Sequence, residues 1–246
     1  MSDAIIEFRQ VSKMFNHTTV LAGMDLAIRP AETLTIIGGS GTGKSVTLKL
    51  IVGLLKPDAG QVLIEGEDVV PLTEDQLLRV RKKIGMVFQS SALFDSLSVA
   101  DNIAYPLREH TTMSEKDIRD RVRETLHLVG LDGIGDKDPA ELSGGMRKRV
   151  ALARAIALAP RIILYDEPTT GLDPTNTEKI NELIVDMEEK LGVTSVVVTH
   201  DMRSAFRVSD RIALLYQGKI VFAGTPREIE SSDLPLVRQF IAGTLS

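Results

Sequence analysis

The chain has 246 residues, 43% of them hydrophobic and 26% charged, which is typical of a folded globular protein and excludes a disordered, collagen-like or low-complexity chain. Its formal net charge of −5 provides no broad basic surface, and an aromatic content of 4% leaves few platforms for stacking bases. We therefore expect one large domain, or one domain with a sizeable insert, and no nucleic-acid partner.

Two kinds of targeting segment are missing from the sequence. No apolar run approaches the ~18 to 20 residues of a membrane-spanning helix, and the start, MSDAIIEFRQ, lacks the basic and then hydrophobic order of a signal peptide. Cysteine is absent, which excludes disulfides, thiolate zinc sites and a cysteine nucleophile. We expect a chain that does not cross a membrane by itself and that works in the cytoplasm.

The first third of the chain predicts strands that alternate with helices. Two short stretches, Ile5–Val11 and Met24–Pro30, predict a small antiparallel flank. A β-branched run at Thr33–Ile37 then passes through a glycine-rich turn into a helical pattern that extends to Leu55. Further elements are predicted as strands at Val62–Gly66 and Ile84–Gln89 and as a helix at Leu72–Lys82, opened by a capping-box-like Thr73 and Gln76.

The middle of the chain, from about Ser90 to Ala159, has helical stretches such as Ser114–Leu131 and no convincing strand. Strands resume afterwards, and the pattern predicts an α/β fold with a mostly parallel sheet, an antiparallel β flank and a helical insert. The remaining predicted elements are strands at Arg161–Pro168 and Val193–Asp201, a helix at Thr175–Gly192, a hairpin at Arg211–Gly224 turning at Gly218, and a short helix at Leu234–Gly243. We therefore predict a single domain, 1–246, with a core formed by 1–90 and 160–246 and a helical subdomain at 91–159.

The strongest chemical signal is the run Gly38-Gly39-Ser40-Gly41-Thr42-Gly43-Lys44-Ser45, which lies between a predicted strand and a predicted helix. Glycines let the chain curl around a phosphate, and backbone N–H groups at the helix N-terminus bind its anionic oxygens. In such a loop the lysine neutralises the β and γ phosphates and the final hydroxyl binds Mg²⁺. An ordinary glycine-rich turn is the alternative, and the flanking strand and helix disfavour it.

Two more segments carry polar groups of catalytic type. Asp166 and Glu167 end a buried apolar strand, at the sheet edge where open α/β proteins bind ligands. Asp166 would hold Mg²⁺ and Glu167 would polarise the attacking water, although the pair could also merely cap the strand. In the second segment, Ser143, Gly144 and Gly145 precede a long helical pattern. Ser143 could cap a helix whose first N–H groups bind phosphate, or the three residues could be an ordinary helix start.

Taken together, these segments resemble the ATP-binding cassette (ABC) ATPases over nearly the whole chain, with Gly38–Ser45 as the Walker A motif of a P-loop NTPase (RecA-like) core. The other motifs follow in the family's order: Gln89 at the Q-loop, Leu142–Met146 as the signature, Ile162–Asp166 as Walker B with Glu167 after it, Gly171–Asp173 as the D-loop, and His200 as the H-loop switch. Phe15 stands where the family places an aromatic that stacks on adenine, and a core role is equally compatible with the sequence.

The resemblance implies an ATPase that uses ATP and Mg²⁺ and works as a head-to-tail homodimer. Each ATP would lie between Walker A of one subunit and the signature, Ser143 to Gly145, of the other, with Asp173 of the D-loop nearby. Gln89 would link the metal and the attacking water to the docking surface of a membrane partner, and His200 would contact the γ phosphate. Without this resemblance, Gln89 would be interpreted as a residue at the end of a strand and His200 as an ordinary loop histidine.

Two features depart from the commonest family pattern. Position 146 is Met where many members have Gln, and the basic triplet Arg147-Lys148-Arg149 follows it. A solvated helix face is the simpler interpretation for one or two of these three residues, and also for the basic cluster Arg79–Lys83. The C-terminal segment from Leu234 could brace a neighbouring subunit or pack on its own domain.

The residues of these motifs are similar to those in the ATPases of Mla and Mce-type lipid transport systems, most of all Ser45-Val46-Thr47-Leu48-Lys49 and Met146. That branch implies a polytopic permease docked near the Q-loop and helical subdomain, a lipid-binding Mce-type protein, and a location on the inner face of the bacterial inner membrane. The alternative is a soluble ABC ATPase in iron-sulfur assembly, repair or cell division. A P-loop kinase fits less well, because the signature and H-loop have no role there.

Overall fold

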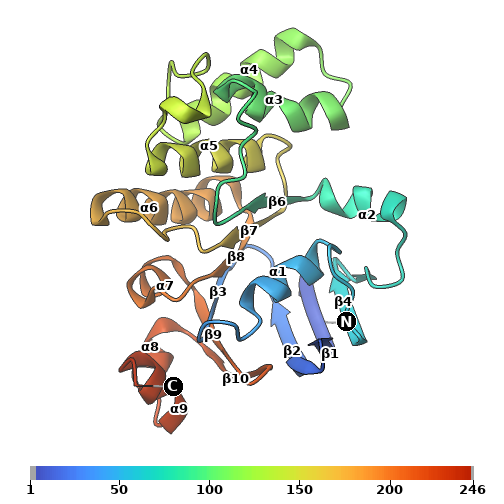
Figure 1. Cartoon of the computed structure of the whole chain (residues 1–246), viewed down its shortest axis with the longest axis vertical. Coiled ribbons are helices and arrows are strands. Elements are labelled where there is room, and N and C mark those ends of the chain that lie inside the picture. The colour runs from blue at the N-terminus through green and yellow to red at the C-terminus, as the bar shows by residue number, and fades with distance from the viewer. Residues whose placement is uncertain (1–3, 245–246) are drawn as a thin grey trace.

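Two sheets form the centre of the molecule in the computed structural model, which describes residues 4–244 (Figure 1). The strands are β1 Ile6–Phe15, β2 Thr18–Ile28, β3 Thr33–Ile37, β4 Ala59–Ile64, β5 Glu67–Asp68, β6 Ile84–Val87, β7 Ile162–Asp166, β8 Thr194–Val198, β9 Arg211–Tyr216 and β10 Lys219–Gly224. One sheet has six strands in the order β10-β9-β3-β8-β7-β6, and the other has four in the order β2-β1-β4-β5.

Helices cover the six-stranded sheet and form a separate layer at one end of the molecule (Figure 1). They are α1 Lys44–Ile51, α2 Glu74–Arg81, α3 Val99–His110, α4 Glu115–Leu128, the 3₁₀ turn η1 Pro139–Glu141, α5 Gly144–Ile156, α6 Pro174–Leu191, α7 Met202–Val208, α8 Pro226–Glu230 and α9 Pro235–Ile241. Among residues 4–244, no helix is both long enough and apolar enough to span a bilayer.

The larger sheet is the parallel sheet that the sequence predicts. Strands β6, β7, β8, β3 and β9 pair in parallel, and β10 joins β9 as the antiparallel arm of the hairpin that turns at Gly218. Every residue of β3, β7 and β8 is buried, because α5 and α6 cover one face of the sheet and α1 with the four-stranded sheet covers the other. Parallel pairing brings the carboxyl ends of these strands to one edge, where the loops after them meet.

The antiparallel flank is confirmed, but its predicted limits are wrong. β1 and β2 are longer than Ile5–Val11 and Met24–Pro30, and their pairing contains register shifts between Phe8 and Met14. These irregularities interrupt the alternation of apolar and polar residues, so the alternating pattern in the sequence covers only part of each strand. The helix predicted to reach Leu55 also ends early, at Ile51.

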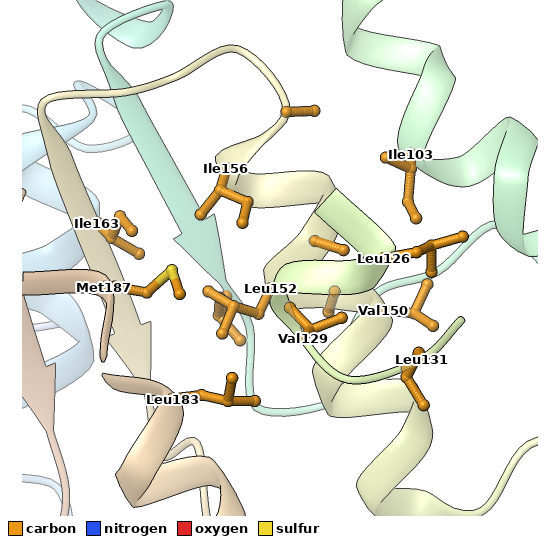
Figure 2. Packing of buried hydrophobic residues seen from close by; sticks show 14 of the residues in the cluster. Ile103, Leu126, Val129, Leu131, Val150, Leu152, Ile156, Ile163, Leu183 and Met187 are labelled. Atoms are coloured by element: carbon orange, nitrogen blue, oxygen red, sulfur yellow. The ribbon is translucent and has the colours of Figure 1, made fainter. Parts of the chain in front are cut away.

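The helical insert is confirmed as well, since residues 90–159 contain α3, α4, η1 and α5 and no strand. Its apolar residues share one cluster with the sheet, and Figure 2 shows Leu152 and Ile156 of α5 beside Ile163 of β7 and Met187 of α6. The helical layer is thus packed continuously against the core through α5. A displacement of this layer must therefore be transmitted to the loops around β6 and β7.

Candidate functional site

A cavity of about 660 Å³ lies at the carboxyl ends of β3, β7 and β8. The loops after these strands supply most of its wall, β2 adds one side chain, and the C-terminal α9 adds another. The lining residues are Val20, Gly38, Gly39, Ser40, Gly41, Gly43, Lys44, Ser45, Val46, Gln89, Glu167, His200 and Phe240. The fold thus brings the predicted phosphate loop, Q-loop, catalytic carboxylate and switch histidine to one place.

The glycine-rich loop has a shape that larger residues could not adopt. A Cβ atom at Gly38 would lie 2.5 Å from the carbonyl oxygen of Leu215, and Gly43, the N-cap of α1, has φ of 108°. The Thr42 hydroxyl donates to the carbonyl of Gly39 at 2.9 Å and closes the curl. Because α1 begins directly after this curl, at residues that line the cavity, its unpaired first N–H groups suit an anion bound there.

Lys44 places a positive charge beside this loop. The side chain is buried, and Nζ donates to the carbonyl oxygens of Gly38 at 2.8 Å and Gly39 at 2.9 Å. Burial lowers the pKa of Lys44, while the nearby carboxylates of Glu167 and Asp166 act in the opposite direction. A charge that is poorly solvated binds a phosphate strongly, because little water has to be displaced from it.

Ser45 and Asp166 provide the oxygen ligands that fit a divalent cation. The Ser45 hydroxyl donates to Oδ1 of Asp166 at 2.8 Å, which joins the start of α1 to the end of β7. Between residues 4 and 244 there is no cluster of three or more His, Asp or Glu side chains arranged for a metal. One carboxylate and one hydroxyl suit Mg²⁺, which binds few protein groups and takes its other ligands from water and phosphates.

Glu167 is held in a strained position over the cavity. Its φ is 48°, which is unusual for a residue with a Cβ, and its N–H donates to the carbonyl of Val198 at 2.9 Å. Oε2 of Glu167 lies 2.9 Å from Nδ1 of His200 and accepts hydrogen bonds from the hydroxyls of Thr170 and Thr199. The carboxylate is thus aimed by three side chains, and its position suits a base that accepts a proton from water.

Gln89 enters the cavity from the loop after β6, and its carbonyl oxygen accepts a hydrogen bond from Nζ of Lys148 on α5. Lys148 is buried, so the solvated interpretation of the basic triplet is wrong for this residue. Its neighbours differ: Arg147 is exposed, while Arg149 is half-buried and donates to the carbonyls of Val129 and Gly130. Burial also lowers the pKa of Lys148, against the opposing effect of Asp166 and Glu167.

The other predicted site residues lie outside the described lining of this cavity. Ser143 caps α5, with its hydroxyl accepting from the N–H of Met146 at 3.3 Å, and Gly144 and Gly145 form the first turn. Asp173 caps α6, and hydrogen bonds from Asn176 lower its pKa. A Cβ at Gly145 would lie 2.7 Å from Oδ1 of Asn176, so the signature segment packs directly on the start of α6.

Phe15, at the end of β1, is 40% exposed with Nζ of Lys13 5.3 Å from its ring centre, which excludes the core role. The C-terminal segment packs on its own domain, since Val237 is buried in a cluster with Ile229 and Phe240 lines the cavity. The basic cluster Arg79–Lys83 is mostly exposed; only Arg81 is half-buried, donating to two carbonyls of the α1–β4 connection.

Sequence reasoning missed Lys148, Thr170, Thr199 and Phe240 at this site. The two threonines could have been suspected from their positions beside Glu167 and His200 in the chain, because loops that follow neighbouring parallel strands converge. Lys148 and Phe240 carry no local signal. Phe240 reaches the cavity, and Lys148 reaches the backbone of two loops beside it, because helices from segments far apart in the sequence pack there.

Comparison with known proteins agrees with this geometry. Residues 21–170 match the family model of the ABC transporter. The Intermembrane phospholipid transport system ATP-binding protein MlaF of Haemophilus influenzae is 41% identical over 99% of this chain and 92% of its own. The Mycobacterium leprae protein named Probable ribonucleotide transport ATP-binding protein mkl is 44% identical over 97% of this chain and 69% of its own. The Arabidopsis thaliana Protein TRIGALACTOSYLDIACYLGLYCEROL 3, chloroplastic, is 44% identical over 99% and 75%.

Solved structures show the same fold. The dimeric ATP-binding cassette MJ0796, in a post-hydrolysis state bound to ADP and Pi, superposes with a TM-score of 0.83 at 36% identity, covering 90% of this chain and 99% of that one. CbiO1 of Clostridium perfringens, part of the ABC transporter complex cbiONQ, superposes with a TM-score of 0.85 at 30% identity over 99% and 100%. The chain therefore belongs to the ABC transporter family and is one of its ATP-binding, ATP-hydrolysing domains.

Proposed function

We propose that the chain is the motor subunit of a bacterial ABC complex that moves phospholipid, or a related hydrophobic molecule, between envelope membranes. The similarity to MlaF carries the substrate class, because it extends over 99% of this chain and 92% of the relative. The mkl relative is named for ribonucleotide transport, but this chain spans only 69% of it. The geometry of the ATP site carries no information about the transported molecule, so the cargo is assigned from relatives.

In the proposed reaction, Lys44 and the N–H groups of the 38–45 loop hold the β and γ phosphates of ATP. Ser45, Asp166 and the amide oxygen of Gln89 would hold Mg²⁺, which neutralises charge on the phosphates when bound. Glu167 accepts a proton from the water that attacks the γ phosphorus, while the bond from that phosphorus to the β–γ bridging oxygen breaks and ADP leaves. His200 contacts the γ phosphate and keeps the carboxylate oriented. The contact of 2.9 Å between His200 and Glu167 supports this pairing.

We propose that two copies of the chain complete each ATP site. Ser143 and Gly144 are exposed at the N-terminus of α5 and lie away from the cavity of their own chain. An exposed helix N-terminus suits the γ phosphate bound by a second copy. In a dimer with two-fold symmetry, the two ATP sites, each formed by both copies, would be equivalent, and Asp173 would lie near the interface. The dimeric state of the MJ0796 cassette supports this arrangement.

The proposed permease docks beside the Q-loop. A groove of about 390 Å³ lies between β6, α2 and α3 and includes Arg81, Phe88, Phe94, Tyr105 and His110. The rings of Phe94 and Tyr105 pack with centroids 5.0 Å apart, yet both side chains remain more than 40% exposed. An exposed aromatic pair next to Gln89 suits an amphipathic segment of a membrane protein. A lipid-binding Mce-type protein completes the proposed complex, which places this chain on the inner face of the inner membrane.

The proposal can be separated from a soluble role in iron-sulfur assembly, repair or cell division by isolating the complex. We expect the tagged chain, purified from detergent-solubilised membranes, to retain a polytopic permease, and mass spectrometry to find phospholipid enriched at least about tenfold over a mock purification. A matched preparation carrying Phe94→Ser and Tyr105→Ser should lose the permease, because the groove loses its aromatic wall. Co-purification with soluble proteins only would contradict the transport role.

A further inference from the structure

Lys148 lies where two loops of the ATP site meet the helical layer. Its Nζ donates to the carbonyl oxygen of Gln89, 59 residues away in the chain, at 2.5 Å. It also reaches the carbonyl oxygen of Glu167 at 3.4 Å. The side chain is 6% exposed, so these carbonyls replace most of the water that its ammonium group would otherwise bind. One side chain therefore connects the Q-loop, the loop of the catalytic carboxylate and α5.

A second cation of α5 holds the same loop farther along. Arg154 donates to the carbonyls of Ser91 at 3.0 Å and Ala92 at 2.7 Å, and both of these residues have positive φ. The helix also lies close against β6, because a Cβ at Gly85 would be 2.6 Å from the carbonyl oxygen of Ala155. Hydrogen bonds thus hold both ends of residues 89–92 on α5. Lys148 binds the end near the ATP cavity, and Arg154 binds the end near the groove that contains Phe94 and Tyr105.

Lys148 and Arg154 differ in the loops to which they donate hydrogen bonds. The side-chain hydrogen bonds of Arg154 go to Ser91 and Ala92, whereas Lys148 also contacts the backbone of Glu167, whose φ of 48° is unfavourable for a residue with a side chain. A strained backbone persists only where its surroundings hold it, and the ammonium group on the Glu167 carbonyl is one such contact. Ser143, the N-cap of the same helix, lies about 1.4 turns before Lys148, so the position of α5 is also set by whatever binds at its N-terminus.

We propose that Lys148 is a positioning residue for ATP hydrolysis, which keeps the Gln89 and Glu167 loops in register with α5. It does not line the ATP cavity, and it acts through the two backbone carbonyls. Removing it lets the Glu167 carboxylate and the Gln89 amide drift relative to each other, while the phosphate cradle of the 38–45 loop stays intact. The turnover number therefore falls, and the KM for ATP changes little. This inference rests on the ATPase activity and does not depend on the transported molecule.

Arg149 provides a matched control on the same helix. It is also basic, it is half-buried where Lys148 is buried, and it also donates to two backbone carbonyls, but these belong to Val129 and Gly130 at the end of α4, away from the ATP site. Arg149→Met therefore removes an equivalent tie of α5 without touching the catalytic loops. Any effect of Lys148→Met that arises only from loosening α5 must appear in Arg149→Met as well.

The test compares kcat, KM for ATP and Tm of the full-length wild type, Lys148→Met, Lys148→Arg and Arg149→Met. We expect Lys148→Met to lower kcat at least about tenfold with KM within about twofold, Lys148→Arg to restore kcat to within about threefold, and Arg149→Met to keep kcat within about twofold. A kcat within twofold of wild type in Lys148→Met, or an equal loss in Arg149→Met, would overturn the proposal. Should Lys148→Met fail to fold, Lys148→Leu, which likewise removes the donor and the charge, is measured in its place under the same limits.

Discussion

Substituting Gln for Glu167 is expected to lower the kcat of ATP hydrolysis at least about 100-fold while ATP binding persists. An amide cannot accept the proton of the attacking water, yet it has the size of the carboxylate and can keep hydrogen bonds to Thr170 and Thr199. The strained backbone and the phosphate loop remain unchanged. A loss of 100-fold corresponds to about 2.7 kcal/mol of transition-state stabilisation.

The measurement is steady-state phosphate release, with ATP binding followed in parallel by fluorescence titration. Because hydrolysis is blocked, Glu167→Gln should also accumulate as an ATP-bound dimer in sedimentation velocity. The matched control is the double variant Glu167→Gln with Ser143→Arg, which should remain monomeric because a bulky cation replaces the exposed N-cap of α5. Hydrolysis at the wild-type rate in Glu167→Gln would show that this carboxylate is not the base.

Replacing Lys44 with Ala should weaken ATP binding at least about 100-fold, or about 2.7 kcal/mol. The ammonium group is buried beside the curl of the 38–45 loop, where its interaction with phosphate is poorly screened by solvent. Burial already disfavours the charged form of Lys44, as its lowered pKa indicates, so folding should tolerate the change. The loss is therefore expected in affinity rather than in Tm.

Lys49→Ala is the control for Lys44→Ala, because Lys49 lies on the same helix, α1, with its side chain exposed to solvent. Both variants remove one positive charge and the same three methylene groups, but only the Lys44 side chain is buried beside the phosphate loop. A fluorescent ATP analogue titrated into each should show wild-type affinity for Lys49→Ala only. Unchanged affinity for the ATP analogue in Lys44→Ala would show that Lys44 does not bind the phosphates.

The features that could be predicted from the sequence are those whose causes lie close together in the chain. The strand Thr33–Ile37 is found where predicted, because a β-branched run buried on both faces leaves a clear pattern. The capping box of α2 is confirmed, with Thr73 and Gln76 exchanging hydrogen bonds, since both partners lie within one turn. The loop from Gly38 to Ser45 was predictable for the same reason, and the family order of the motifs then located Glu167 and His200.

Features that depend on distant contacts could not be predicted. Lys148 is buried only because the carbonyls of Gln89 and Glu167 surround its ammonium group, and nothing in its immediate neighbourhood distinguishes it from exposed Arg147. Phe240 reaches the cavity because α9 packs on α8 and on the sheet, which the C-terminal sequence does not indicate. The α7 helix was missed because its few apolar residues follow the H-loop directly without a clear period.

The central proposal is that ATP hydrolysis at this site drives the movement of a lipid through a membrane partner. The most direct measurement is transfer of a fluorescent phospholipid by the purified membrane complex in proteoliposomes, with the wild-type chain and with Glu167→Gln compared at equal loading. We expect transfer that requires ATP with the wild type and that falls to the no-ATP level with Glu167→Gln. Transfer that proceeds equally in both, or that does not depend on ATP, would contradict a transport role for ATP hydrolysis at this site.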